Sequence, residues 1–318
     1  MSFSSKVKEE LYRHVSPARH CQLAELAAII HFSGSIGAEK KGIFLKIHAE
    51  NALVVRKSFT LLQKTFNIST ETQVCQEEQQ TGFFCRIEDQ ELVLKILQGI
   101  KFLDGTGKLN AAPGGGSDGL RAPVSRLLIK NSCCQRAFLR GAFLAAGSMS
   151  DPVKGYHLEM VCSRESQARQ LQEILAEFEI EGRIVQRKKY FVVYVKEGSG
   201  ISDFLNVTEA HVALMEFENS RVVREVRNTV NRRVNCETAN ITKTVTAAAR
   251  QLDDILLLQE KYGFEKLPAS LRQMAEVRLE HPDAPLKELG MYLDPPVGKS
   301  GVNHRLRKLC ELADAIRS

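Results

Sequence analysis

Two apolar segments that contain small residues repeat along the chain at a fixed distance. Residues 26–36 (LAAIIHFSGSI) align with residues 139–149 (LRGAFLAAGSM), and Gly147 follows Gly34 after 113 residues (147 − 34 = 113). This spacing predicts two helices that each end at the glycine. We expect Gly34 and Gly147 to be left-handed C-caps, because glycine adopts that conformation most easily.

Both predicted helices have candidate start signals. Ser16 is expected to cap the first helix, with Pro17 at its first position. In the second, Ser132 and Gln135 have the spacing of a capping box. The sequence therefore defines both ends of each repeated helix.

The pattern that follows each helix repeats as well. Alternating or β-branched runs predict strands, and apolar residues at helical spacing predict further helices. Each half is expected to run helix, strand, helix, strand, strand, helix. The predicted strands are 42–48, 70–75, 82–87, 156–161, 183–186 and 190–195, and the second helices of the halves are 54–66 and 165–178. This pattern predicts an α+β body made of two pseudo-symmetric α/β halves.

The chain is expected to divide into several parts. Glycine and proline gather in residues 104–123, a composition typical of a flexible linker. Strand signals stop at about residue 218, and helical patterns such as 245–262 and 268–280 follow. We therefore expect an all-α domain at the end. The predicted parts are a first half, 1–105, a linker, 106–130, a second half, 131–218, a basic linker, 219–244, and a C-terminal domain, 245–318.

Composition adds a weak charge signal. The chain has 318 residues, of which 43% are hydrophobic, and 44 Lys and Arg exceed 38 Asp and Glu for a net charge of +6. A mildly basic surface tolerates a polyanion such as DNA. The N-terminal charges precede no apolar signal-peptide core, and no run of about 18 apolar residues occurs. We therefore expect a soluble, cytoplasmic protein without a membrane partner.

The cysteines show no metal-binding motif in the sequence. The eight cysteines are scattered without a C-x-x-C pair, and His14, His20 and Cys21, although close in sequence, lack a fourth ligand. In a reducing cytosol such cysteines are expected to be buried or idle thiols. We therefore expect no metal, no cofactor and no small-molecule substrate.

The end of the chain has the pattern of two helices separated by a tight break. Leu286, Leu289 and Leu293 share one helix face, and residues 294–298 (DPPVG) end that helix. The apolar residues of the next helix are expected to pack inward as one stripe. They are Val302, Leu306, Leu309, Ala313 and Ile316. A short helix, a break and a basic helix are the parts of a helix-turn-helix.

The opposite face of the last helix has the composition of a recognition helix. Arginine can pair with guanine and asparagine with adenine in the major groove, whereas Lys299 and Arg305 are better placed for phosphates. The candidate DNA-binding residues are Lys299, Ser300, Asn303, His304, Arg305, Arg307 and Lys308. The alternative is a solvated polar face on an ordinary amphipathic helix.

A second basic segment lies between the body and the C-terminal domain. Residues 221–233 carry five arginines and one glutamate, which gives a local net charge of +4. The candidate phosphate contacts are Arg221, Arg224, Arg227, Arg232 and Arg233. The alternative is an exposed helix face whose valines, Val222, Val226 and Val230, pack on the body.

The repeated helices resemble the signature of LAGLIDADG homing endonucleases, in which small residues let two helices pack at a pseudo-twofold interface below a DNA-binding saddle of strands. In those enzymes the penultimate signature position is an acid that holds a divalent metal. Ser33 and Ala146 occupy it here, and Asp151 lies too far along the chain to replace it. The resemblance therefore implies a body without catalytic residues. The alternative is two core helices whose small residues coincide. His31 is interpreted as a core histidine rather than a base.

Over essentially its whole length, the chain is similar to the WhiA family of sporulation and cell-division regulators. The most specific stretches include 139–148, 231–240 and 298–307. The resemblance implies double-stranded DNA binding, transcription regulation, links to sporulation, cell division and chromosome segregation, a nucleoid-associated location and no enzymatic activity. The alternatives are a homing-type endonuclease with displaced acids, and a module that docks a transcription-machinery or regulator protein.

Overall fold

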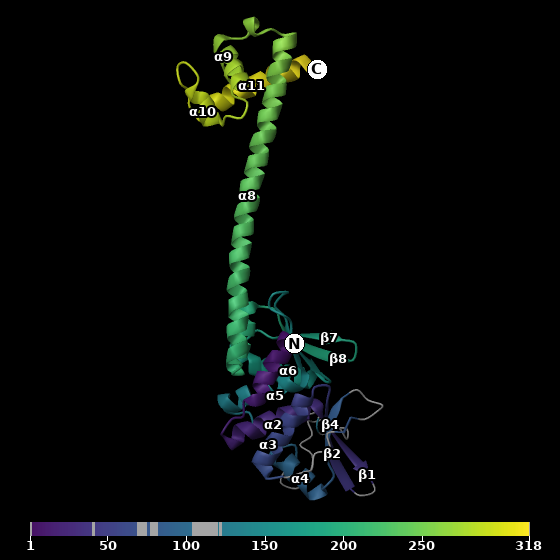
Figure 1. Cartoon of the computed structure of the whole chain (residues 1–318). Coiled ribbons are helices and arrows are strands. Elements are labelled where there is room, and N and C mark those ends of the chain that lie inside the picture. Colours follow the sequence, from purple (N-terminus) through teal and green to yellow (C-terminus); the bar gives the residue numbers. More distant parts are fainter. Residues whose placement is uncertain are drawn as a thin grey trace. The chain divides into compact units, whose positions relative to one another are not determined.

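The computed structural model describes residues 2–39, 42–68, 75–76, 82–103, 120 and 123–317. Most of the predicted linker 106–130 and of the predicted strand 70–75 lies outside these residues. The chain forms two compact units, Met1–Arg224 and Glu225–Ser318 (Figure 1). Each unit has its own hydrophobic core.

The first half of the first unit combines helices with a four-stranded antiparallel sheet of order β1-β2-β4-β3. Its elements are α1 (Phe3–Arg13), α2 (Arg19–Ser33), β1 (Gly34–Glu39), β2 (Gly42–Ala49), α3 (Ala52–Phe66), β3 (Cys75–Gln76), β4 (Phe83–Ile87) and α4 (Gln90–Gly99). Helices α2, α3 and α4 all contact this half's strands.

The second half repeats this arrangement with the sheet order β5-β6-β8-β7. Its elements are α5 (Ser132–Ala146), β5 (Gly147–Met149), β6 (Leu158–Cys162), α6 (Glu165–Ala176), β7 (Arg183–Arg187), β8 (Tyr190–Val195) and α7 (Gly198–Val207). The predicted α+β body of two equivalent halves is confirmed. The predicted order lacked one strand in each half, because β1 and β5 begin directly where α2 and α5 end.

The glycines at these helix ends are not left-handed caps, as the sequence had led us to expect. Gly34 has φ −91° and ψ 152°, and Gly147 has φ −89° and ψ 152°, so both are extended. Glycine is needed at both positions because a side chain there would not fit. A Cβ on Gly34 would collide with the carbonyl oxygen of Ile30, and a Cβ on Gly147 would collide with the ring of Phe143. The chain can therefore turn from helix directly into strand.

The helix starts also differ from the prediction. Helix α2 follows Ala18 as N-cap rather than Ser16, and α5 follows Asn131 rather than Ser132. Neither N-cap residue makes a side-chain capping hydrogen bond. At these starts, Cys21 and Ala24 of α2 pack with Cys134 and Ala137 of α5.

Helices α2 and α5 pack on each other along their length and form the centre of the first unit (Figure 1). The backbone of Gly141 on α5 lies against the backbone of Glu25 on α2. A Cβ added at Gly141 would lie 2.9 Å from the Cβ of Ala28 on α2. Ala27, Ala28 and Ala142 are completely buried. The small residues therefore serve the close helix contact that the resemblance implied.

A buried charge network crosses this helix pair. Glu25 is fully buried, its Oε1 lies 3.1 Å from Nζ of Lys57 on α3, and its Oε2 lies 3.5 Å from Nε of Arg140 on α5. Arg140 also pairs with Glu209 at 2.6 Å. Burial raises the pKa of Glu25, while Lys57 and Arg140 oppose that rise. Loss of one partner would leave a buried charge uncompensated, which makes this network a structural tie between α2, α3 and α5.

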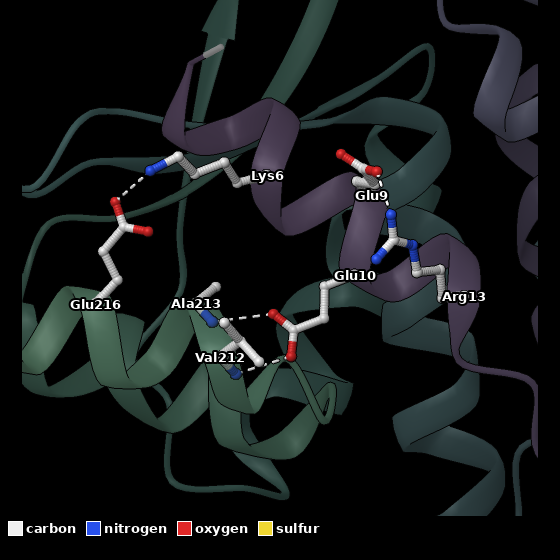
Figure 2. A pocket seen from close by; sticks show the side chains of 7 residues that line it. All are labelled: Lys6, Glu9, Glu10, Arg13, Val212, Ala213 and Glu216. Atoms are coloured by element: carbon white, nitrogen blue, oxygen red, sulfur yellow. Dashed lines mark hydrogen bonds and ion pairs between the residues drawn. The ribbon is translucent and has the colours of Figure 1, made fainter.

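Helix α8 (His211–Lys261) contains neither glycine nor proline, so nothing in its sequence interrupts the helical hydrogen bonds. Its start is capped from a distance. Glu10 on α1 accepts hydrogen bonds from the backbone N–H groups of Val212, at 2.8 Å, and Ala213, at 2.9 Å (Figure 2). The segment 219–244, which the sequence suggested as a linker, is helical as part of α8.

The second unit is all α-helical in its described residues. After α8 it contains the short 3-10 helix η2 (Phe264–Lys266), α9 (Ala269–Glu280), α10 (Leu286–Met291) and α11 (Lys299–Arg317). Ile255 and Leu258 of α8 pack with apolar residues of α9, α10 and α11 in one core. This small core fixes the position of α11 relative to the other three helices.

Candidate nucleic-acid interface

Helices α10 and α11 are joined by a tight turn, as the sequence predicts. The backbone N–H of Val297 donates to the carbonyl oxygen of Gly290 at 2.9 Å. A Cβ on Gly290 would collide with the carbonyl oxygen of Val297, so this position requires glycine. The turn therefore returns the chain against α10 before α11 begins at Lys299.

One face of α11 is buried and anchors the helix. Val302, Leu306, Leu309 and Ala313 are each at most 1% exposed, and they pack with Leu289 of α10. The inward stripe predicted from the spacing is confirmed for these residues, and Ile316 packs at its edge as a partly buried side chain. Because this stripe fixes the rotation of α11, it also fixes which side chains face outward.

The outward face carries most of the predicted DNA-binding side chains. Arg305 differs from the others because it is half-buried at the edge of the apolar stripe. The exposed members are Lys299, Ser300, Asn303, His304, Arg307 and Lys308. The structure thus gathers six polar or basic groups on one accessible helix surface, beginning at the helix N-terminus.

Arg307 has an acidic neighbour on the same helix. Its Nε lies 3.0 Å from Oε1 of Glu311, and both side chains are largely exposed. Arg307 and Asn303 also line a pocket of about 360 Å³ between α11 and the end of α8. An exposed pair of this kind contributes little free energy, so a stronger acceptor can replace Glu311 at low cost.

The five arginines of the basic segment have different surroundings. Arg221 pairs with Glu218 at 2.7 Å and donates to Ser202, and Arg224 lies over the ring of Tyr156 at 5.0 Å. Arg227 and Arg232 are exposed, and Arg233, also exposed, pairs with Glu237 at 3.0 Å. At about 100° per residue these side chains spread around α8 rather than forming one basic stripe.

The alternative interpretation of this segment was an exposed helix face with packed valines, and the segment does lie within helix α8. Val222, Val226 and Val230 are 59%, 57% and 53% exposed. Val222, which belongs to the same unit as the body, is therefore not packed against it.

The positions equivalent to the catalytic acids lie at the C-terminal ends of α2 and α5. Ser33 and Ala146 are the last residues of these helices, and neither offers a carboxylate. Asp151 accepts the backbone N–H of Val153 at 2.9 Å within a turn. Within the described ranges, the one cluster of His, Cys, Asp and Glu side chains that could hold a metal ion lies at the opposite ends of the two helices.

His31 is a core residue, as interpreted from the sequence. It is 4% exposed, and its Nδ1 lies 2.8 Å from the carbonyl oxygen of Leu120. Burial lowers the pKa of His31 to about 4. His31 is therefore enclosed in the core of the first unit.

A pocket of about 420 Å³ between α1 and the start of α8 is lined by charged side chains that already have partners (Figure 2). Lys6 pairs with Glu216 at 2.7 Å, and Arg13 pairs with Glu9 at 2.5 Å. Glu10 caps α8. This pocket is therefore part of the junction between α1 and α8 and has no group aimed at a ligand.

Sequence reasoning missed one cluster entirely. His20 and Cys21 begin α2, Cys133 and Cys134 begin α5, and their ligand atoms lie within 4.8 Å of one another. The expectation that His20 and Cys21 lack further ligands is therefore wrong. The repeat offset of 113 residues, which maps His20 on Cys133 and Cys21 on Cys134, was the signal that could have revealed the cluster.

The two units together define the class of protein. A LAGLIDADG-like body with two pseudo-symmetric halves and no acids at the signature positions is followed by a helix-turn-helix unit. Three family models match in the same order: the WhiA N-terminal LAGLIDADG-like domain over residues 19–103, the WhiA LAGLIDADG-like domain over 135–227 and the WhiA C-terminal HTH domain over 230–313.

The chain belongs to the WhiA family. It is 50% identical to the probable cell division protein WhiA of Lachnoclostridium phytofermentans, with 100% of both chains covered. It is 44% identical to the protein of the same name from Desulforamulus reducens, over 100% of this chain and 97% of that one. The crystal structure of full-length DUF199/WhiA from Thermatoga maritima matches with a TM-score of 0.59 and 25% identity, covering 99% of each chain. Among the described residues, no helix has the length and apolar content needed to cross a bilayer.

Proposed function

We propose that this protein is a sequence-specific, double-stranded DNA-binding regulator of transcription that acts in cell division. The observation that carries the proposal is the α10–α11 pair, in which a buried stripe holds six exposed polar or basic side chains outward on one helix. A role in sporulation and chromosome segregation, and a location at the nucleoid, belong to the same proposal and rest on family membership.

The outward face of α11 supplies base recognition. The Arg307 guanidinium can donate two hydrogen bonds to guanine, and the Asn303 amide can pair with adenine. Lys299, at the helix start, and Arg305, at the edge of the stripe, contact phosphates and fix the register of the helix in the groove. Glu311 releases Arg307 on binding, because an exposed ion pair is weak compared with a bidentate pair to a base.

The basic segment of α8 supplies phosphate contacts that do not depend on sequence. Exposed Arg227 and Arg232 are the strongest candidates, and Arg233 can exchange Glu237 for a phosphate. Arg221 and Arg224 contribute less, since each already has a partner in the first unit. Contacts of this kind raise affinity for any duplex and make it depend on salt.

The protein is not a nuclease. Hydrolysis of a phosphodiester by a LAGLIDADG site needs carboxylates that hold divalent cations at the ends of both signature helices. Ser33 and Ala146 stand there instead, and the nearby Asp151 already accepts a backbone hydrogen bond in its turn. The body then serves as a surface for DNA or for a protein of the transcription machinery.

Selection from genomic DNA tests the proposal. Full-length protein is mixed with sheared DNA of the source bacterium, and bound fragments are recovered and sequenced. We expect one common motif, which Arg307→Ala loses. Arg126→Ala is the matched control because it also removes an exposed positive charge, from the first unit, and it should retain the motif. Recovery of fragments without any shared motif would contradict base recognition and favour the docking role.

A further inference from the structure

Four side chains from two sequence-distant helix starts meet in the first unit. We call them the interhelix thiol cluster, and they are His20, Cys21, Cys133 and Cys134. His20 and Cys21 lie in the first turn of α2, and Cys133 and Cys134 lie in the first turn of α5. Each half of the body thus contributes two adjacent residues at equivalent positions, related by the offset of 113 residues.

The distances within the cluster suit a single metal ion. Nδ1 of His20 lies 3.2 Å from Sγ of Cys134, 3.4 Å from Sγ of Cys21 and 4.0 Å from Sγ of Cys133. Bonds of about 2.3 Å to sulfur and about 2.0 Å to nitrogen in a tetrahedron place ligand atoms about 3.5 to 3.8 Å apart. All four ligand atoms lie within 4.8 Å of one another, which is too close to enclose a multi-iron cluster.

The surroundings also suit such a site. Cys21 and Cys134 are buried at 5% and 3% exposure among small apolar side chains, whereas His20 and Cys133 are exposed. An ion can therefore enter from solvent and end in a partly dry site. Burial raises the pKa of Cys21 and of Cys134, so both thiols keep their protons until a cation displaces them.

We propose that the interhelix thiol cluster binds one Zn²⁺ through three thiolates and the Nδ1 of His20. Three thiolates and one imidazole are a ligand set typical of closed structural zinc sites. The three thiols release their protons to solvent when the ion binds, which leaves a net charge of −1 on the ion and its ligands. The site ties the two halves together at the starts of α2 and α5, away from Ser33 and Ala146, so it has no part in phosphodiester hydrolysis. It stands independently of the proposed DNA recognition.

The direct test is the metal content of untagged full-length protein, purified under reducing conditions and measured by mass spectrometry of the elements. The expected result is one zinc per chain. Chelator-stripped protein should then take up one Co²⁺ and show the visible absorption bands of a tetrahedral site together with sulfur-to-cobalt charge transfer. Failure to bind either ion near one per chain would overturn the proposal, and so would a Co²⁺ spectrum without the charge-transfer band.

Two variants identify the ligands. Cys133→Ser removes an exposed thiol and should weaken Co²⁺ binding at least about tenfold, with loss of charge-transfer intensity. Cys236→Ser, which removes an exposed thiol on α8, is the matched control and should bind like the unchanged protein. Equal binding by both variants would overturn the assignment. Circular dichroism verifies that each variant is folded, and zinc should raise the melting temperature of the control more than that of Cys133→Ser.

Discussion

Arg307 forms an ion pair with Glu311, and the Arg307 guanidinium must break this pair in order to contact a base. The sequence alone predicts that Arg307 is on the polar face, because the apolar stripe has a clear helical period. The i,i+4 spacing of Arg307 and Glu311 makes the pair possible, but only the structure shows that it forms. The contacts of Arg221 with Ser202 and of Arg224 with Tyr156 could not be predicted in this way, because these partners lie on other elements.

The buried His31 predicts how the free energy of unfolding depends on pH. Its pKa is lowered by burial to about 4, from 6.5, so between these values the unfolded chain binds a proton that the folded protein does not. Stability conferred by this neutral histidine is therefore present above pH 6.5 and is lost as the pH falls toward 4. We expect it to contribute a loss of about 2 kcal/mol in the free energy of unfolding between pH 7 and pH 5.

Urea unfolding of the full-length protein at both pH values measures this loss. His31→Asn should show a pH dependence smaller by about 2 kcal/mol, because asparagine can still donate to the carbonyl of Leu120 but does not titrate. His211→Asn, at an exposed position, is the control and should behave like the unchanged protein. An unchanged slope in His31→Asn would contradict the assignment.

At the scale of elements, the repeat predicted the order of most helices and strands but not their junctions. Strands β1 and β5 were missed because Gly34 and Gly147 are needed for close contact within their own helices, not for a left-handed turn. A glycine required by close contact and a glycine required by a left-handed turn cannot be distinguished in the sequence. The helix starts were misplaced for a similar reason, since contacts between α2 and α5 replace the local capping bonds that the sequence suggested.

Gly141 tests the packing of these two helices. A Cβ there would collide with the backbone carbonyl of Glu25, and helix propensity favours alanine by only about 1 kcal/mol. The steric collision should outweigh the gain in helix propensity, so Gly141→Ala should lower the free energy of unfolding by about 1–3 kcal/mol. Thermal unfolding measures the change. Gly155→Ala is the matched control, because a Cβ at Gly155 meets nothing within 4 Å. Equal stability of the two variants would argue against close packing at Gly141.

At the scale of the whole molecule, the sequence predicted an α+β body followed by a helical unit with a DNA-binding pattern. It left open whether the basic segment is a linker or an exposed helix face, and it did not predict that this segment is part of a 51-residue helix. Charge there suggested a linker, although the absence of glycine and proline favoured a helix. The interhelix thiol cluster was missed because Cys133 and Cys134 join His20 and Cys21 only once the halves pack together.

The absence of acids at Ser33 and Ala146 predicts that DNA survives contact with the protein. Supercoiled plasmid incubated with full-length protein and Mg²⁺ or Mn²⁺ should stay intact, because no carboxylate stands at either signature position to hold the ion that hydrolysis requires. Gel electrophoresis detects nicking or linear product. Cleavage in excess of that caused by a mock preparation from cells without the protein would contradict a nuclease-free body.

Base recognition by α11 is measured by the ratio of dissociation constants for two duplexes of equal length. One carries the motif recovered from genomic DNA and the other has the same composition in scrambled order, and both are titrated with full-length protein at physiological salt. If α11 reads bases, the specific duplex should bind at least about 10³-fold more tightly. A ratio near one would show that the protein binds DNA only through its charge and would contradict base recognition by α11.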